Sequence, residues 1–596
     1  MSQCLIFSRS NLGQMLGACG PISIPSSSHP PYYKTHHFSV SLAHIDSHAC
    51  LPLLLLMSTQ ASSPLSPYLS SILLLLLLHL YVSVSFADPT SIYSPFLDCL
   101  TKHADPSDDL SDIVYAKTNV SYTSILENYI RNARFNTSST PKPSIIVTPS
   151  KESHVQATVI CAKYIGVQIK IRSGGHDYEG TSYVSDQTFI ILDLFNLRNI
   201  SVDIPNEVAV VQSGATLGEL YYRIWEKSKV HGFPAGVCPT VGVGGHLGGG
   251  GYGNMLRKYG LSVDHIIDAT IVDVNGRILN KDSMGENLFW AIKGGGGGSF
   301  GVILSFTVKL VRVPETVTVF RVQKTLEENA TDLVVQWQDV APQTDDRLFM
   351  RLLLQPVTSK VNKNQKTVRA SVVTLFLGRS DELVTLLEKE FPLLGLKKEN
   401  CNETSWIDSV LWWANFALGT KPEVLLDRKL NSANFLKRKS DYVQTPISRA
   451  GLEWIWKKMI ELGKTGFVFN PYGGRMSEIP SDATAFPHRA GNLFKIQYSV
   501  NWNEAGSAAD KNFTSQARRL YSYMTPFVSK NPRSAFLNYR DLDIGINHFE
   551  ENSFEEGQVY GRKYFNDNLE RLVKVKSAVD PQNFFRNEQS IPVLPK

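Results

Sequence analysis

Residues Phe233–Tyr252 have the sequence FPAGVCPTVGVGGHLGGGGY, with eight glycines, one cysteine, one histidine and no charged side chain. An ordinary solvated loop is not so free of charge. Glycine at this density costs backbone entropy, and it is found where a chain turns at positive φ or lies very close to another group. The stretch therefore predicts a large ligand packed against bare backbone.

Two further runs repeat the glycine signature, RSGGHDYEG at Arg172–Gly180 and KGGGGGSFG at Lys293–Gly301. Parts of these glycine runs match the dinucleotide fingerprint G-x-G-x-x-G, as any glycine-saturated stretch does. A genuine fingerprint follows a strand, opens a helix and has an acidic residue about twenty positions later. No matching run shows all three features, so we exclude a nicotinamide site of the Rossmann type.

Five motifs follow one another along the chain: SGGHDYEG, GVCPTVGVGGHLGGGGYG, LFWAIKGGGGGSFGVI, NYRDLDIG and DPQNFFRNEQSIP. In this order, from about Phe96 to the C-terminus, the sequence resembles the plant berberine bridge enzyme-like family of FAD-linked oxidoreductases, within the vanillyl-alcohol oxidase superfamily. The resemblance implies an α+β fold. A PCMH-type FAD-binding α/β domain would be completed by the C-terminal segment, and a substrate domain would have an antiparallel sheet and helices.

The predicted elements agree with this division, and 596 residues are too many for one core. Residues 141–315 alternate strand and helix patterns, for example QIKIR and SHVQATVICAKYIG, which is typical of an α/β nucleotide-binding domain. Residues 316–530 have alternating strands such as VTVFRV, and helices such as GLEWIWKKMIEL, and they predict the substrate domain with its helices on one face. Residues 88–140 are expected to be a helical N-terminal segment of the FAD domain, to which residues 531–596 return.

The N-terminal part of the chain looks like an export signal. Met57 opens a segment with an almost pure leucine core, Ile72–Leu78, which ends in SFA before Asp88. This pattern predicts a signal peptide at 57–87, and residues 1–56 are interpreted as a non-native or disordered extension, with translation starting at Met57. The apolar run is short for a spanning helix. We therefore expect secretion to the extracellular space or cell wall, without stable membrane insertion.

Cysteines and glycosylation sequons fit an exported protein. The family resemblance pairs Cys99 with Cys161, and an oxidising compartment would preserve that disulfide. Cys401 is expected to be free. Six N-x-[ST] sequons follow the predicted cleavage site, and together they predict a glycoprotein; their asparagines are Asn119, Asn136, Asn199, Asn329, Asn402 and Asn512.

FAD needs backbone N–H donors for its pyrophosphate, and glycine turns at strand ends form concave nests of such groups. The family resemblance implies that His176 bonds the 8α-methyl of the flavin and that Cys238 bonds its C6. A thiolate and an imidazole are competent nucleophiles for such additions, although a lone buried His or Cys is usually structural, as we expect of His246. The further predicted cofactor-binding residues are Arg172, Ser173, Gly174, Gly175, Asp177, Gly242, Val243, Gly244, Gly245, Gly297, Gly298, Gly301 and Val302.

Oxidation of an alcohol at a flavin needs a base for the hydroxyl proton. A tyrosine serves only if its pKa falls well below its free value of about 10. The resemblance offers Tyr539 in NYRDLD as the base, and Tyr252, polarised by Lys495, as its competitor. Gln497 and Tyr178 would orient the substrate hydroxyl. Outside such motifs, most tyrosines lie at the edge of a core.

Val241, three residues after Cys238, stands where the family places a gate on the oxygen-reactive face of the flavin. A small valine there resembles the oxidases of the family, whereas a bulkier leucine resembles the members that avoid O₂. We therefore expect O₂ as the electron acceptor and H₂O₂ as a product.

The resemblance leaves two alcohol substrates open. The site residues favour the allylic alcohol of a monolignol, oxidised to an aldehyde, and the anomeric hydroxyl of an oligosaccharide is the alternative. A function of another class is a catalytically silent flavin-binding wall glycoprotein, against which the intact set of site residues argues. The formal charge of +5 is spread along the chain and gives no case for nucleic acid. We expect a monomer without a metal.

Overall fold

The computed structural model describes residues 92–429 and 433–595. The predicted extension and signal peptide, which end at residue 87, lie outside these residues. The described chain combines helices with three larger sheets and one two-stranded ribbon, which confirms the predicted α+β class. Within it, every helix is too short or too polar to cross a bilayer.

The first sheet has four strands in the order β1-β2-β4-β3. β2, β4 and β3 run parallel, whereas β1 pairs with β2 in the antiparallel direction. Parallel strands need a crossover, and α5 (Glu152–Ile165) connects β2 to β3, between which β4 is inserted in the sheet. α5 ends at Gly166, whose φ of 77° suits the left-handed cap. The strands are β1 (Val114–Ala116), β2 (Ile145–Val147), β3 (Gln168–Arg172) and β4 (Phe189–Asp193).

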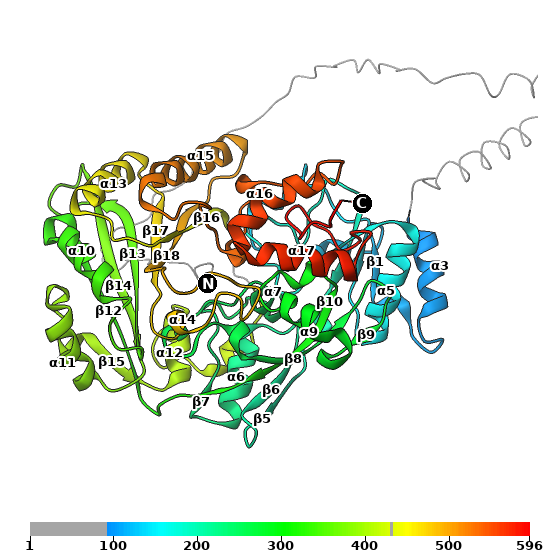
Figure 1. Cartoon of the computed structure of the whole chain (residues 1–596), viewed down its shortest axis with the longest axis horizontal. Helices are drawn as coiled ribbons and strands as arrows, with labels where there is room; N and C mark the ends of the chain where they lie inside the picture. The colour runs from blue at the N-terminus through cyan, green and yellow to red at the C-terminus, as the bar shows by residue number, and fades with distance from the viewer. Residues whose placement is uncertain (1–91, 430–432, 596) are drawn as a thin grey trace, which may run out of the picture. The chain divides into compact units, whose positions relative to one another are not determined.

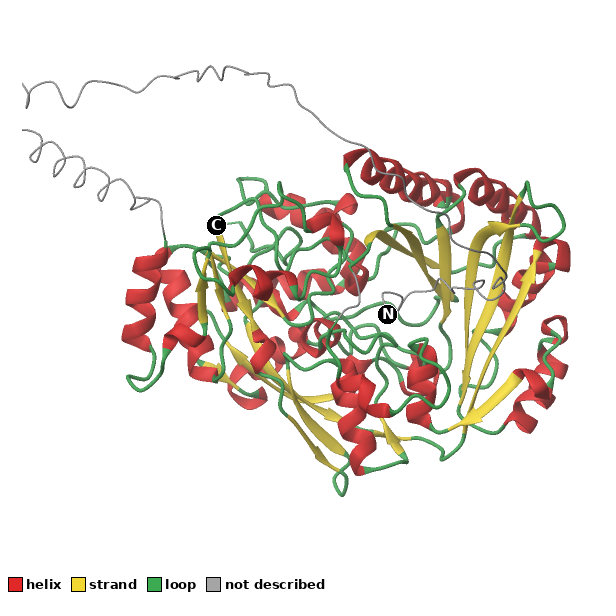
Figure 2. Ribbon diagram, turned by 180° about the vertical axis from the view of Figure 1, so that it is seen from behind, coloured by secondary structure: helices red, strands yellow, loops and turns green. Residues whose placement is uncertain are grey.

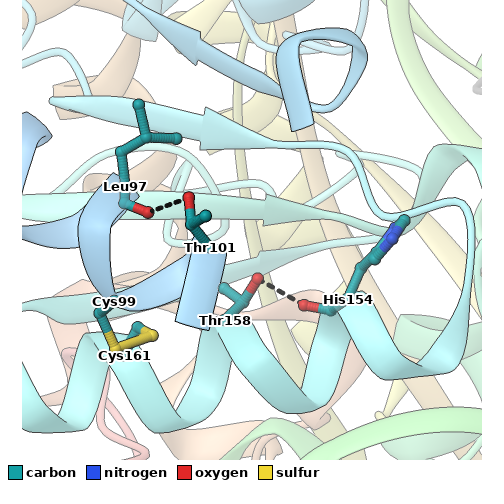
Figure 3. Close-up of a disulfide and its surroundings, with 6 residues drawn as sticks. All are labelled: Leu97, Cys99, Thr101, His154, Thr158 and Cys161. Carbon is teal, nitrogen blue, oxygen red and sulfur yellow. Dashed lines mark hydrogen bonds between the residues drawn. A yellow bond between two sulfur atoms is a disulfide. The ribbon is translucent and has the colours of Figure 1, made fainter. Parts of the chain in front are cut away.

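A disulfide joins the N-terminal helix to this sheet layer. Cys99 on α3 (Tyr93–His103) is bonded to Cys161 on α5, with the two Cα atoms 5.6 Å apart. Figure 3 shows the bond between the two neighbouring helices. The pairing that the resemblance implied is therefore present, and Cys401 is free.

The second sheet has five antiparallel strands in the order β5-β6-β10-β8-β9. Between β6 and β8 the chain forms α6 (Leu217–Lys227) and then the glycine-rich run. α6 starts at a capping box in which Thr216 and Glu219 satisfy each other's backbone N–H groups. The strands are β5 (Ile200–Asp203), β6 (Val208–Gln212), β8 (Ile266–Val272), β9 (Ile278–Leu279) and β10 (Val302–Lys309), and α9 (Lys281–Ile292) lies between β9 and β10.

The third sheet has seven antiparallel strands in the order β15-β12-β14-β13-β17-β18-β16. Helices α10 (Ala330–Val340), α11 (Ser380–Glu390), α13 (Arg449–Leu462) and α15 (Ser507–Tyr523) cover one face, as Figures 1 and 2 show. The other face packs in part against α12 (Trp406–Trp413) and also carries side chains that line the cavity described below. The strands are β12 (Val317–Thr325), β13 (Leu348–Thr358), β14 (Lys366–Phe376), β15 (Cys401–Thr404), β16 (Phe435–Val443), β17 (Gly466–Pro471) and β18 (Phe494–Trp502).

The C-terminal segment lies against the first two sheets. Its helices α16 (Ser553–Phe565) and α17 (Asn568–Val579) are red in Figure 1, where α17 lies beside the green α9. Lys576 on α17 is fully buried, and its Nζ pairs with Asp580 at 2.6 Å and donates to the carbonyl of Ser299 at 2.7 Å. The last part of the chain is thus bonded to a glycine-rich loop far away in sequence.

The edge strand β16 is tethered by a residue of the N-terminal segment. The side chain of Asn132 donates to the carbonyl of Leu436 at 3.2 Å and accepts from the Leu436 N–H at 3.3 Å. The Asn132 amide thereby makes the two hydrogen bonds that a neighbouring strand would make, and it covers part of an otherwise open sheet edge. This contact holds the segment that contains Asn132 against the seven-stranded sheet.

We expect loss of the Cys99–Cys161 disulfide to destabilise the protein. It joins residues 62 positions apart, and removal of such a bridge lowers the free energy of unfolding by about 2–5 kcal/mol because the unfolded chain gains freedom. Urea unfolding of Cys161→Ser measures this, with Cys401→Ser as the matched control. Equal midpoints for the two variants would contradict the prediction.

Candidate active site

A cavity lies where several separate parts of the chain meet. Its walls come from residues 173–178 after β3, from the glycine-rich residues 236–249, and from residues 296–301 before β10. Residues 536–540 of the C-terminal segment close another side, and side chains of the large sheet reach it as well. The three glycine runs singled out in the sequence therefore converge on one site.

The two main glycine runs touch backbone to backbone. A Cβ on Gly174 would lie 2.3 Å from the nitrogen of Gly242, and a Cβ on Gly242 would lie 2.3 Å from the nitrogen of Gly174. Neither position has room for a side chain. At Gly245, by contrast, a Cβ would meet nothing within 4 Å, and this glycine lines the cavity. Bare backbone facing open space fits a large planar ligand such as a flavin dinucleotide.

His176 and Cys238 both line this cavity. The Nε2 of His176 is 3.0 Å from the hydroxyl of Thr240, two residues after Cys238, so a hydrogen bond joins the two glycine-rich segments. Burial, with a smaller effect from the Arg131 guanidinium, holds the pKa of His176 well below its usual range. The imidazole is therefore neutral at pH 7, the form in which its nitrogen is a nucleophile.

Four of the predicted cofactor residues have a side chain or a backbone N–H group that is already engaged within the protein. The Arg172 side chain is fully buried away from the cavity, where it pairs with Asp193 at 2.7 Å. Residues 243–248 form a short helix, α7, instead of a turn, and the N–H groups of Val243 and Gly244 donate to the carbonyls of Ala215 and Ser213. Val302 is fully buried in β10, opposite Val272. Backbone pairing and packing thus engage these groups within the protein, while Gly244 also lines the cavity. The part of these four residues in FAD binding stays a prediction.

Tyr252 is held by groups other than the predicted Lys495. Its hydroxyl donates to Oδ1 of Asn470 and accepts from Nη2 of Arg351 at 3.2 Å. Burial raises the pKa of Tyr252, and the Arg351 charge lowers it in opposition. A guanidinium therefore polarises the hydroxyl itself, in addition to the predicted Lys495, whose Nζ lies over the ring of Tyr252.

Lys495 lies among aromatic rings. Its Nζ is 3.9 Å from the ring centroid of Tyr252, 3.6 Å from that of Phe536 and 4.4 Å from that of Tyr539. It has no hydrogen-bond partner among the residues that the structure describes. Burial, and then the nearby Arg351, hold its pKa well below its usual range. Lys495 thus contacts both candidate bases through their ring faces.

The other predicted catalytic residues form one group. The rings of Tyr178 and Tyr539 are 5.9 Å apart, and both line the cavity. Gln497 donates from Nε2 to the Tyr178 hydroxyl at 3.2 Å, and it shares one face of β18 with Lys495 because strand side chains alternate. Burial and the neighbouring Tyr178 and Tyr252 hydroxyls raise the pKa of Tyr539 well above its usual range.

One end of the cavity is polar. Arg438 on β16 is buried there, donates from Nη2 to Oδ1 of Asn501 at 2.6 Å, and has an Nε without a partner among the described residues. Asp177 is the one carboxylate among the described cavity-lining residues, and Arg540 already pairs with it at 3.0 Å. This end therefore offers donors to a hydroxylated or acidic ligand.

The sequence analysis missed Arg351, Asn470 and Arg438. A signal for Arg351 exists, because it is a lone charge within the apolar run LFMRLLL, where a buried arginine needs a reason. Arg438 lies in the cationic stretch KRK and Asn470 in a short apolar strand. For these two, only the strand pairing shows which way the side chains point; Arg438 lines the cavity, whereas Asn470 is buried behind the Tyr252 hydroxyl.

Comparison with known proteins decides the family. A family model described as an FAD binding domain matches residues 143–281, and one described as berberine and berberine like matches residues 535–592. Berberine bridge enzyme-like 21 of Arabidopsis thaliana is 63% identical over 515 residues, which are 86% of this chain and 95% of that protein. The chain belongs to the berberine bridge enzyme-like family. Berberine bridge enzyme-like 2 of the same plant is 60% identical and covers 88% of this chain and 98% of its own.

Solved structures of related sequence have the same fold. Phl p 4, a grass pollen allergen with glucose dehydrogenase activity, is 43% identical with a TM-score of 0.79, over 84% of this chain and all of its own. Berberine bridge enzyme from Eschscholzia californica is 38% identical with a TM-score of 0.78, over 84% of this chain and 99% of its own. The chain is therefore a member of a family of FAD-dependent oxidoreductases with the PCMH-type fold.

We predict that Gly245→Leu folds but no longer retains flavin. The added side chain enters open space in the protein alone, yet it occupies the place of a ligand packed on the backbone. The measurement is the ratio of flavin to protein absorbance, with the thermal midpoint of the flavin-free protein as a check on folding. Gly174→Ala is the contrasting variant, because its methyl group has no room and the fold itself should suffer. A full flavin content in Gly245→Leu would contradict the prediction.

Proposed function

We propose that this protein is an exported FAD-dependent oxidase that oxidises the anomeric hydroxyl of a saccharide. The observation that carries the proposal is the polar end of the cavity, where the Arg438 guanidinium donates to Asn501 and lies 5.7 Å from the ring centroid of Tyr178. A monolignol presents mostly an aromatic ring, and it would leave the buried Nε of Arg438 unpaired, which is costly. A saccharide hydroxyl or carboxylate satisfies it.

His176 and Cys238 are proposed as the two covalent attachment points of FAD. Both line the cavity from opposite glycine-rich segments, and the neutral imidazole and the thiol are suitable nucleophiles. The remaining contacts would come from the backbone of Ser173, Gly175 and Gly245, with Asp177 held by Arg540. When bound, FAD supplies the acceptor for a hydride.

Tyr539 is proposed as the base that takes the substrate hydroxyl proton, with Tyr252 as its competitor. Burial leaves the pKa of both phenols above its usual value, contrary to the lowered pKa that a tyrosine base was expected to have, and the charge of Arg351 opposes that rise at each of them. The proposed base therefore depends on the Arg351 charge to form a phenolate. Gln497 fixes the Tyr178 hydroxyl, which in turn would hold the substrate oxygen next to Tyr539. Gln497 and Tyr178 would thus position the substrate hydroxyl within hydrogen-bond reach of the base before the proton is transferred.

Val241 supports O₂ as the acceptor. It is a half-buried cavity residue whose N–H donates to the Cys238 carbonyl, so it stands beside one proposed attachment point. Among the matched structures, wild-type Phl p 4 is described as a glucose dehydrogenase, and a variant with valine in place of isoleucine as a glucose oxidase. We propose that Val241 plays the same part here and that H₂O₂ is formed.

Export and glycosylation complete the proposal. The predicted signal peptide lies outside the described residues, but the disulfide is typical of an oxidising compartment. All six sequon asparagines are exposed, as a glycan requires: Asn119, Asn136, Asn199, Asn329, Asn402 and Asn512.

A substrate screen by anaerobic flavin bleaching tests the proposed reaction. We expect a neutral cello-oligosaccharide or an acidic oligouronide to bleach the flavin faster than coniferyl alcohol does. Faster bleaching by coniferyl alcohol would restore the monolignol assignment. If no substrate bleaches the flavin, the silent wall glycoprotein becomes the better assignment.

The same experiment opened to air tests Val241. The reduced flavin of the wild type should be reoxidised by O₂ faster than that of Val241→Leu. Equal rates would contradict the proposed role of Val241 in the reaction with O₂.

Arg351→Met should move the pH dependence of bleaching. The base must be deprotonated, so the rate rises with pH through the pKa of a phenol. Because Arg351 lowers that pKa, its removal should shift the rising part of the pH–rate profile to higher pH, by about 1–3 units. Arg321→Met is the matched control. Arg321 lies 5.4 Å over Trp412, as Arg351 lies 4.9 Å over Trp413, but it does not line the cavity. An unmoved profile in Arg351→Met would contradict the assigned role.

A further inference from the structure

Five charged side chains form a buried cluster at the edge strand β16, here called the ionic clamp. Lys437 contacts Glu179, and its Nζ is 2.8 Å from Oδ1 of Asp541 and 3.3 Å from Oδ2 of Asp543. Lys439 is 2.5 Å from the other oxygen of Asp541 and 2.9 Å from Asp543. Glu179, Asp541 and both lysines are almost completely buried.

The ionic clamp is not part of the cavity wall. Lys437 and Lys439 point to the face of the sheet that the helices cover, whereas Leu436 and Arg438, their neighbours in β16, line the cavity on the other face. Strand alternation forces this separation. The chemistry proposed above therefore does not use these charges directly.

The clamp does join the three segments that carry the cavity residues. Glu179 directly follows Tyr178, Asp541 comes two residues after Tyr539, and Lys437 directly precedes Arg438 in β16. One lysine ammonium thus contacts a carboxylate from the turn after β3 and a carboxylate from the C-terminal segment. These two segments come from opposite ends of the folded chain.

A cluster of this kind is costly to bury, and well-packed apolar residues are often as stable or more so. Its value then lies in geometry, because both carboxylates must meet the lysine at hydrogen-bond distance. Burial alone would lower the pKa of Lys437, but Glu179, Asp541 and Asp543 raise it above its usual range, so the lysine is charged. Loss of that charge would leave Glu179 and Asp541 buried with less compensation.

We propose that Lys437 is a positioning residue that sets the distance between Tyr178 and Tyr539 by holding Glu179 and Asp541. The ring separation of 5.9 Å and the hydrogen bond from Gln497 to the Tyr178 hydroxyl both depend on where these backbones lie. The inference rests on the proposed roles of the two tyrosines. It concerns the rate of the hydride and proton step and leaves substrate binding by Arg438 intact.

The main test is Lys437→Met, studied as the flavin-loaded protein. Its limiting rate of anaerobic bleaching at saturating substrate should fall about 10- to 100-fold, since a displacement on the order of 1 Å can cost that much. The substrate Kd from the same titration should change about twofold or less, as expected for a positioning effect. Lys437→Arg keeps the charge and should recover most of the rate. Glu179→Gln is the milder second variant if Lys437→Met does not fold, and it should slow bleaching about 10-fold.

Asp264→Asn is the matched control. Asp264 is a buried carboxylate that accepts from both terminal nitrogens of Arg489 and from the Leu261 N–H, and it contacts neither tyrosine segment. It should lose stability as the clamp variants do, yet bleach at the wild-type rate. A wild-type rate in Lys437→Met and Glu179→Gln, or an equal loss in Asp264→Asn, would overturn the proposal.

A crystal structure of Lys437→Met gives a readout without substrate. The rings of Tyr178 and Tyr539 should move apart from their 5.9 Å separation, or take several positions. If they stay in place, the clamp has no positioning role. If the wild type is bleached by no substrate, the proposed function fails, and this structure still decides the inference about the clamp.

Discussion

The close approach of two backbones at Gly174 and Gly242 is the constraint on which the rest of the site depends. A Cβ at either residue would collide with the nitrogen of the other, so the two segments meet only as bare chain. This contact carries His176 on one segment and Cys238 on the other to the same cavity. The hydrogen bond between His176 and Thr240 then fixes their relative position.

The large antiparallel sheet supplies the other half of the site through simple alternation. Lys495 and Gln497 share one face of β18, and Arg438 on β16 shares that face through strand pairing. The opposite face of the same strands packs against helices. A small number of polar residues can therefore lie on the cavity side of the sheet without disturbing the apolar core on the helix side. The C-terminal segment adds Tyr539 to the wall of the cavity.

Much of the fold and part of the site follow from sequence patterns. Short apolar runs such as VAVVQ and period-3.6 runs such as GLEWIWKKMIEL become strands and helices because their apolar faces are buried. The glycine runs correctly mark the cavity. Their local conformation was not predictable, because the N–H groups of Val243 and Gly244 at the start of α7 donate to carbonyls of another segment.

The orientation of side chains was not predictable either. Arg172 and Val302 lie in glycine-rich motifs, but packing directs their side chains away from the cavity. Sequence spacing also cannot show that Arg351, from another strand, reaches Tyr252.

The central claim is that bare backbone around one imidazole and one thiol holds a flavin at two covalent points. Acid denaturation of the purified protein tests it most directly. The account predicts that all the yellow colour stays with the precipitated polypeptide, that His176→Ala and Cys238→Ala each still keep it, and that the double variant releases it. Complete release of the flavin from the denatured wild-type protein would contradict the account.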